Sequence, residues 1–332
     1  MAPMARHALS HDQLVAGVRA GDSRALARAI SLVENRDPQA HALVRELYPE
    51  TGGAYAIGVT GPPGVGKSSL IGTLVRHVRS LGRTVGVVSV DPSSPFSKGA
   101  LLGDRIRLAD HFLDPGVFIR SMGSRGHLGG LAEATLQALL LLDAAGRDVI
   151  FLETVGTGQS DVEVMGIADT VLLVLMPGSG DSVQALKAGI MEIPDVIVVN
   201  KMDHPAAKTM VSDVRAVLAL DPNVERRPQL LSTEALTGEG VEQLWDALES
   251  RRADLAEAGE LQARRRRNLA GEVVAIATGR ARDRIEQALE SDDALREAIA
   301  AVQRRELDPL TAVDAVVDAL FARRTNGTPG AR

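Results

Sequence analysis

A glycine-rich segment that ends in lysine and serine carries the most specific chemistry in this sequence. Its residues are Gly61, Pro62, Pro63, Gly64, Val65, Gly66, Lys67, Ser68 and Ser69. They fit the pattern G-x-x-x-x-G-K-[ST], and an apolar run precedes them while a helical pattern follows. In that context backbone N–H groups and a helix N-terminus converge on phosphate oxygens. We therefore predict a nucleotide site in which Lys67 contacts the β- and γ-phosphates and the Ser68 hydroxyl binds Mg²⁺.

A second motif, Asn200-Lys201-Met202-Asp203, follows the apolar run 196–199. A carboxylate placed just beyond a buried strand can accept hydrogen bonds from guanine N1–H and from the guanine 2-amino group. Adenine offers neither donor at that edge, so the carboxylate would stay buried and unpaired. We expect Asp203 to read the base, Asn200 to brace the loops, and the Lys201 stem to lie along the purine.

A third segment begins Glu234-Ala235-Leu236 and continues with two glycines. It is similar to the S-A-x-x-G-x-G loop, in which the alanine N–H reads guanine O6. Glu234 stands where that pattern has serine, so only the backbone role of Ala235 is expected to carry over. The three motifs together predict GTP and GDP as ligands.

Two further segments could assist hydrolysis. Glu153-Thr154-Val155-Gly156 ends an apolar run where Ras-type GTPases carry D-x-x-G. We expect Glu153 to hold Mg²⁺ through water and the Gly156 N–H to contact the γ-phosphate. Thr157 stands where a water-orienting glutamine is usual, and Gln159 lies two residues further on. The expected intrinsic hydrolysis is therefore slow.

Two aspartates are candidates for orienting the attacking water. Asp91 ends the second apolar run of the central region, where it could also bind Mg²⁺ or a metal-bound water. Asp104 lies in the sequence Leu-Gly-Asp-Arg of the following loop. A helix cap or a solvated turn is the competing interpretation for each.

The elements that must position these motifs alternate between strand and helix. Apolar, β-branched runs occupy 55–60, 84–90, 117–121, 148–153, 170–175, 196–199 and about 229–233. Helical spacings separate them, which is typical of βαβ units in a mostly parallel sheet buried on both faces. The predicted fold class is therefore α/β, with the motifs at the carboxyl ends of the strands.

Both ends of the chain have helical periodicity without strand signals. Asp22 and Asp37-Pro38 mark helix starts in the first fifty residues. We predict an N-terminal helical extension over 1–50, a P-loop GTPase domain over 51–255 and a C-terminal helical arm over 256–332. The basic run Arg264–Arg267 is interpreted as a solvated helix face rather than a nucleic-acid surface.

Composition excludes several classes of function. The net charge of −6 and eight aromatic residues among 332 disfavour a nucleic-acid binder. The absence of cysteine excludes disulfides, thiolate nucleophiles and cysteine-ligated metals. No apolar run is long enough to cross a bilayer, and no secretory signal is recognisable at the start. We expect a cytoplasmic protein without membrane or nucleic-acid partners.

The sequence resembles the MeaB/ArgK family of P-loop GTPases, in the SIMIBI class with the urease and hydrogenase accessory GTPases. The resemblance covers nearly the whole chain, and its motifs are GPPGVGKSS (61–69), VDPSSP (90–95), LGDR (102–105), SRGHLGGL (124–131), ETVGTGQSD (153–161), the segment 177–195 and NKMD (200–203). Besides Glu234, the segment 96–99 departs from the family by lacking an expected Gly-Gly pair.

The resemblance implies a function that the residues alone do not. Members of this family are chaperones of adenosylcobalamin-dependent methylmalonyl-CoA mutase, where they gate cofactor loading and protect the mutase from inactivation. They form homodimers through their C-terminal helices. The segment 177–189 would be a further switch, with Gln184 and Lys187 facing the nucleotide or the partner.

Three other functions compete with that expectation. A metallochaperone needs soft or imidazole ligands, whereas this chain has no cysteine and its seven histidines lack ligand spacing. A kinase or transport ATPase conflicts with the guanine-type motif. A dimeric scaffold that binds GTP with little turnover stays open because Thr157 replaces the glutamine.

Overall fold

The computed structural model describes residues 9–91, 108–123, 130–154, 166–178, 194–220 and 227–322. The chain forms two compact units, Met1–Glu272 and Val273–Arg332. The first unit contains every motif singled out above. Over the residues that the structure describes, the second unit contains helices and the short turns between them.

The first unit is built on a seven-stranded sheet in which all neighbouring strands are parallel. The spatial order is β3-β2-β4-β1-β5-β6-β7. Their bounds are β1 (Tyr55–Thr60), β2 (Val85–Asp91), β3 (Val117–Gly123), β4 (Val149–Thr154), β5 (Thr170–Leu175), β6 (Val196–Val199) and β7 (Gln229–Ser232). Each strand lies within two residues of its predicted range, so the α/β prediction is confirmed.

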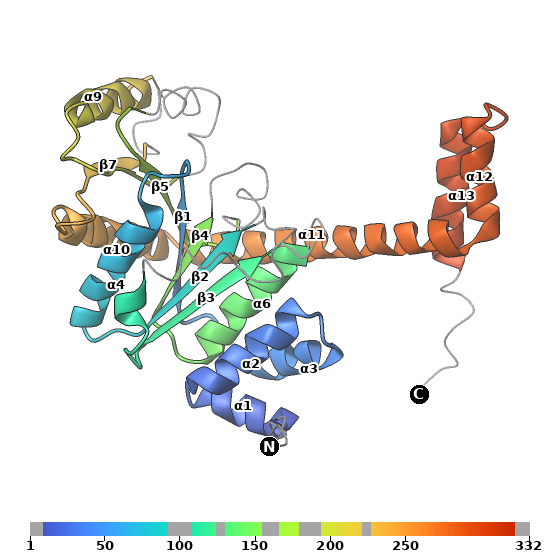
Figure 1. Cartoon of the computed structure of the whole chain (residues 1–332), viewed down its shortest axis with the longest axis horizontal. Coiled ribbons are helices and arrows are strands. Elements are labelled where there is room, and N and C mark those ends of the chain that lie inside the picture. Colours follow the sequence, from blue (N-terminus) through green and yellow to red (C-terminus); the bar gives the residue numbers. More distant parts are fainter. Residues whose placement is uncertain are drawn as a thin grey trace, which may run out of the picture. The chain divides into compact units, whose positions relative to one another are not determined.

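Helices cover both faces of this sheet (Figure 1). On one face, α4 (Lys67–Ser80) and α10 (Val241–Glu257) pack against alternate strand residues such as Ile57 and Phe151. On the other face, α6 (Gly130–Ala144) packs on the β2–β4 side and α9 (Ala207–Leu218) packs on β5 and β6. A sheet buried on both sides explains why the strands are almost continuously apolar.

Three short helices form an outer layer beyond α6. They are α1 (His11–Arg19), α2 (Ser23–Glu34) and α3 (Pro38–Leu47), followed by the 3₁₀ turn η1 (Tyr48–Glu50). Ser10, Asp22 and Asp37 accept backbone hydrogen bonds at their N-termini, as expected for N-cap residues. Their buried side chains share one apolar cluster with α6 and the sheet. The predicted N-terminal helices are confirmed, and they complete the core of the first unit.

The prediction for the basic run was wrong for two of its four arginines. Arg264 and Arg265 lie on α11 (Glu260–Ser291), and each is bonded to a buried aspartate. Arg264 donates to Asp195 at 2.7 Å, and Arg265 donates to both oxygens of Asp169 at 2.6 Å. Burial is the largest single effect on the pKa of Arg264 and lowers it. The hydrogen bond to Asp195 and the attraction of the Asp195, Asp169 and Glu260 charges together outweigh burial, so the net effect raises that pKa.

These ion pairs explain where the first unit ends. The aspartates precede β5 and β6, so the first turns of α11 are bonded to the amino ends of two adjacent strands. The compact unit therefore extends to Glu272, later in the chain than the boundary at 255 drawn from the pattern. The connection between β2 and β3 contains one further 3₁₀ turn, η2 (Ala109–His111).

The second unit contains the end of α11, α12 (Asp293–Gln303) and α13 (Pro309–Ala322). The carboxylate of Asp292 accepts the first backbone N–H groups of α12. Several apolar side chains of α13 are exposed, with Leu310 at 76%. Among the described residues, no helix is both long and apolar enough to cross a membrane.

Candidate nucleotide site

The glycine-rich loop connects the end of β1 to the start of α4, at the centre of the sheet. Gly61 has a φ of 142°, and a Cβ atom there would lie 2.1 Å from the Val174 carbonyl oxygen. Gly66 has a φ of 93°, and its Cβ would lie 2.6 Å from Asn200 Nδ2. Only glycine is tolerated at both positions, because the loop curls tightly between β5 and the Asn200 loop.

Lys67 is the first residue of α4 and is 6% exposed. Its Nζ donates hydrogen bonds to the Gly61 carbonyl at 2.7 Å and to the Pro62 carbonyl at 3.0 Å. The ammonium is therefore held across the mouth of the loop. Phosphate oxygens placed there would be strong acceptors for the same group.

The carboxylate of Glu153 joins the loop helix to the sheet. Glu153 is 6% exposed and lies in register with Val59 of β1 and Ser89 of β2. Its two oxygens accept from Ser68 Oγ at 2.6 Å and from Ser89 Oγ at 3.0 Å. The structure thus brings Ser68 and Glu153 together, and their oxygen atoms are of the kind that a hard cation such as Mg²⁺ prefers.

Sequence reasoning missed Ser89 as a partner in this cluster. Ser89 is a polar residue inside the apolar run 85–90, and its acceptor lies 64 residues later on β4. The local sequence therefore gives no sign of this bond. The Asp91 backbone ends β2 opposite Gly123, while its side chain is outside the description. Asp104, Gly156, Gln159, Gln184 and Lys187 also lie outside the described residues.

Asn200 connects the base-reading segment to the phosphate loop. It is 1% exposed and follows β6 directly. Its Nδ2 donates to the Val65 carbonyl at 2.9 Å, while its Oδ1 accepts from Thr233 Oγ1 and from the Ala235 N–H. Asn200 therefore connects two other loops, those of Val65 and of Thr233–Ala235, through three hydrogen bonds, as a bracing residue would.

Lys201 and Asp203 are the residues of this segment that were predicted to contact the base. Lys201 takes the left-handed conformation with a φ of 61°, and its Nζ donates to the Gly64 carbonyl at 2.8 Å. Its aliphatic stem is thereby laid toward the phosphate loop. Asp203 is exposed, and no other described residue bonds to its carboxylate. That leaves the carboxylate available to a ligand.

Backbone N–H groups of the third segment already have acceptors within the protein. The Ala235 N–H, expected to read guanine O6, donates to Asn200 Oδ1 at 3.1 Å. The following N–H, of Leu236, donates to Glu234 Oε1 at 3.2 Å. Thr73 of α4 donates to the Ala235 carbonyl at 2.8 Å, a link that the sequence did not reveal. The segment is therefore held against both α4 and Asn200.

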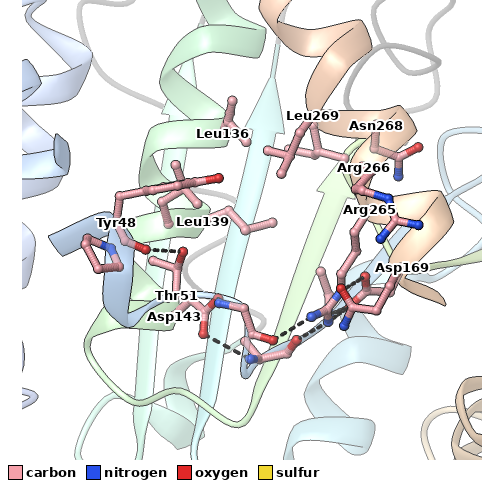
Figure 2. Close-up of a pocket in the computed structure, with 17 residues that line it drawn as sticks. Tyr48, Thr51, Leu136, Leu139, Asp143, Asp169, Arg265, Arg266, Asn268 and Leu269 are labelled. Carbon is pink, nitrogen blue, oxygen red and sulfur yellow. Dashed lines mark hydrogen bonds and ion pairs between the residues drawn. The ribbon is translucent and has the colours of Figure 1, made fainter. Parts of the chain in front are cut away.

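A separate cavity of about 370 Å³ lies at the opposite, amino-terminal ends of the strands (Figure 2). Its walls include Leu136, Leu139 and Leu269. Its innermost charges are already satisfied, because Asp143 accepts the N–H groups of 52–54 and Arg265 pairs with Asp169. The nucleotide motifs contribute nothing to this cavity, so it is distinct from the candidate nucleotide site.

Within the part of the chain that the structure describes, no group of three His, Asp or Glu residues is arranged to hold a metal ion on its own. The oxygen atoms around Ser68 would need phosphate oxygens to complete a coordination sphere. That is the usual arrangement for Mg²⁺ in nucleotide sites.

Comparison with known proteins assigns this arrangement to a family. The family described as methylmalonyl Co-A mutase-associated GTPase MeaB matches residues 26–290. The chain belongs to the MeaB family. It is therefore a GTPase.

Relatives match over most of their length. A presumed GTPase of Pyrococcus abyssi is 44% identical over 92% of this chain and 95% of its own. The GTPase ArgK of Escherichia coli is 37% identical over 74% of this chain and 77% of its own. A solved structure described as a LAO/AO transport system kinase covers 94% of this chain and 97% of its own, with a TM-score of 0.69 and 26% identity.

Proposed function

We propose that this MeaB-family protein is a Mg²⁺-dependent GTPase that acts as a chaperone of adenosylcobalamin-dependent methylmalonyl-CoA mutase. In this role it gates cofactor loading and protects the mutase from inactivation. The family description supports the partner, as does the 34% identity to the mouse mitochondrial methylmalonic aciduria type A homolog over 76% of this chain. The observation that carries the nucleotide part is Asn200, which fastens a guanine-type loop to a phosphate loop.

The phosphate end of GTP is bound by the glycine-rich loop and Lys67. Ser68 would bind Mg²⁺ directly and Glu153 would do so through water, since their oxygens already lie 2.6 Å apart. When bound, Mg²⁺ neutralises charge that develops on the phosphate oxygens during transfer to water. Lys67 adds a second, fixed positive charge at the same place.

The base end is bound by Asp203 through guanine N1–H and the 2-amino group, with the Lys201 stem along one face of the purine. The exposed Leu236 side chain would lie against the base. Guanine O6 would share the Ala235 N–H with Asn200. Asp91 and Asp104 would orient the attacking water, and Gly156, Gln159, Gln184 and Lys187 would respond to the γ-phosphate or the partner.

The second unit would join two copies of the chain. Leu310, Val313 and Val317 are exposed and lie at helical spacing on α13. Exposed apolar side chains in such a row are typical of a surface that a second subunit covers. A homodimer agrees with the family resemblance.

The test is nucleotide turnover by the purified protein with and without the mutase. We expect slow GTP hydrolysis that rises at least tenfold on addition of the mutase, with no ATP hydrolysis. Lys67→Ala should abolish turnover under both conditions, which controls for contaminating enzymes. A GTPase rate that does not change when the mutase is added would contradict the chaperone role. Hydrolysis of ATP as fast as that of GTP would contradict the base site.

A further inference from the structure

The residue that departs from the family pattern, Glu234, occupies a bridging position between the two base-reading loops. Glu234 is buried, at 8% exposed. Its Oε1 accepts from the Leu236 N–H at 3.2 Å, and its Oε2 accepts from the Asp203 N–H at 3.5 Å. One side chain thus contacts the loop that carries it and the backbone of the residue expected to read guanine.

A serine at this position could not make the same bridge. Its single oxygen lies one bond from Cβ, so it can serve a neighbouring N–H of its own loop but not a second loop as well. Glutamate provides two acceptor oxygens at the end of a longer side chain. Both backbone N–H groups donate to a carboxylate, and hydrogen bonds to a carboxylate are charge-assisted, which strengthens them.

The contact at Asp203 belongs to a seam of hydrogen bonds between the loops. The Met202 N–H donates to the Thr233 carbonyl at 3.3 Å, and the Ala235 N–H donates to Asn200 Oδ1 at 3.1 Å. Among these bonds between the loops, the one that Glu234 accepts is donated by the Asp203 N–H. Glu234 also places a second negative charge at the backbone of Asp203, where it favours a base edge that presents N–H donors.

We infer that Glu234 is a positioning residue for base selectivity: it fixes Asp203 and adds negative charge, so that the site favours guanine over purines lacking the 2-amino group. The inference rests on the proposed nucleotide site and deepens it. It predicts discrimination between GDP and IDP, which differ only at the 2-amino group. Ribose and phosphate contacts are common to both nucleotides and cancel in the ratio of their dissociation constants.

The experiment measures Kd for GDP, IDP and ADP by displacement of a fluorescent nucleotide from the full-length protein. In Glu234→Gln an amide NH₂ replaces one acceptor and the charge is removed. We expect the IDP-to-GDP ratio of Kd values to fall about 3- to 10-fold, the scale of one ordinary hydrogen bond, because Asp203 itself is retained. The second variant, Glu234→Ser, should lower the ratio at least as much.

The matched control is Glu239→Gln, which removes the same charge from an exposed position of the same loop. It should leave the ratio at the wild-type value. A ratio in Glu234→Gln and Glu234→Ser equal to or above wild type would overturn the inference, even if both nucleotides bound more weakly. Wild-type protein that binds ADP as tightly as GDP would instead contradict the nucleotide site itself.

Discussion

The side-chain amide of Asn200 donates to the Val65 carbonyl oxygen at 2.9 Å, across 135 residues of sequence. Val65 lies in the loop expected to hold phosphates, and Asn200 begins the loop expected to hold the base. The two halves of the nucleotide site are therefore one hydrogen-bonded structure. A substitution that displaces one loop should therefore also displace the other.

Asn200→Ala should weaken nucleotide binding, although the Asn200 side chain acts through the loops that it connects and not through a contact with the nucleotide. The variant removes hydrogen bonds to Val65, Thr233 and Ala235 and leaves a buried carbonyl and N–H without partners, at about 1–3 kcal/mol each. We expect the Kd for GDP to rise at least tenfold and the melting temperature to fall. Isothermal titration calorimetry and thermal unfolding measure the two effects. The control is Asn35→Ala, which alters an exposed helix end and should leave the Kd for GDP unchanged. Unaltered GDP binding by Asn200→Ala would contradict the coupling between the phosphate loop and the base loop.

Glu153→Gln should lower the GTPase rate and raise the Mg²⁺ concentration needed for half-maximal activity. The neutral amide keeps the shape of the side chain but loses the charge that is held by two serine hydroxyls. We expect at least a 100-fold loss of kcat, because charge stabilisation at phosphoryl oxygens dominates this reaction. Ser89→Ala removes one of the two hydroxyls and should give an intermediate loss. A Mg²⁺ titration curve of Glu153→Gln that coincides with wild type would contradict the metal role.

Asp114 should contribute to stability only above acidic pH. The Arg79 guanidinium, hydrogen-bonded at 2.8 Å, lowers the pKa of the Asp114 carboxyl below its ordinary value. A depressed pKa in the folded state means that the contribution is full above the unfolded pKa of about 3.9 and is lost as the pH falls through the folded pKa.

The free energy of unfolding of Asp114→Asn should therefore be about 1 kcal/mol lower than wild type at pH 7, with the gap closing below about pH 4. Urea unfolding across this range measures it. Asp110→Asn is the control, because Asp110 is exposed and lies 3.9 Å from Arg76. A gap that widens in acid would contradict the assignment.

Arg265→Ala should destabilise the first unit by about 3–5 kcal/mol, since it leaves the buried Asp169 carboxylate without its paired charge. The same variant removes hydrogen bonds to the carbonyls of Gly52 and Ala54. Chemical denaturation followed by circular dichroism measures the effect. The adjacent Arg266→Ala removes an exposed arginine of the same helix and should change stability by less than about 0.5 kcal/mol. Equal losses in the two variants would show that the ion pair adds nothing.

Val313→Asp should convert a dimer into monomers if the exposed face of α13 joins two copies. A charge in the centre of an apolar contact costs several kcal/mol, because it is desolvated without a partner. Light scattering coupled to size exclusion measures the mass. Asp314→Asn, a change to the next residue that introduces no charge, should remain dimeric. A dimer that persists in Val313→Asp would place the subunit contact elsewhere.

The strands were predictable because burial on both faces leaves a strong local pattern. Val149–Leu152 and Val196–Val199 are apolar at every position, so their sequences alone exclude exposed loops. The glycine-rich loop and Asn200 were predictable for a different reason. Their residue types and spacing are required by the chemistry, whatever the rest of the fold does.

The interactions that sequence did not reveal are all long-range. Arg264 and Arg265 look like a solvated run because their partners, Asp195 and Asp169, lie 69 and 96 residues earlier. Ser89 shows no local sign that it donates to a carboxylate on the neighbouring strand. Glu234 was recognised as a departure from the family pattern, but its bond to Asp203 depends on how two loops meet in space.

The layer formed by α1, α2 and α3 has a consequence for how this protein can be shortened. Leu26, Ile30 and Leu43 are almost completely buried against the cluster that α6 shares with the sheet. A gene that begins at β1 would still encode every nucleotide motif, but its product would expose those contact surfaces to water. Such a fragment should aggregate rather than behave as a minimal GTPase, so truncation can remove residues before α1 but not the helices themselves.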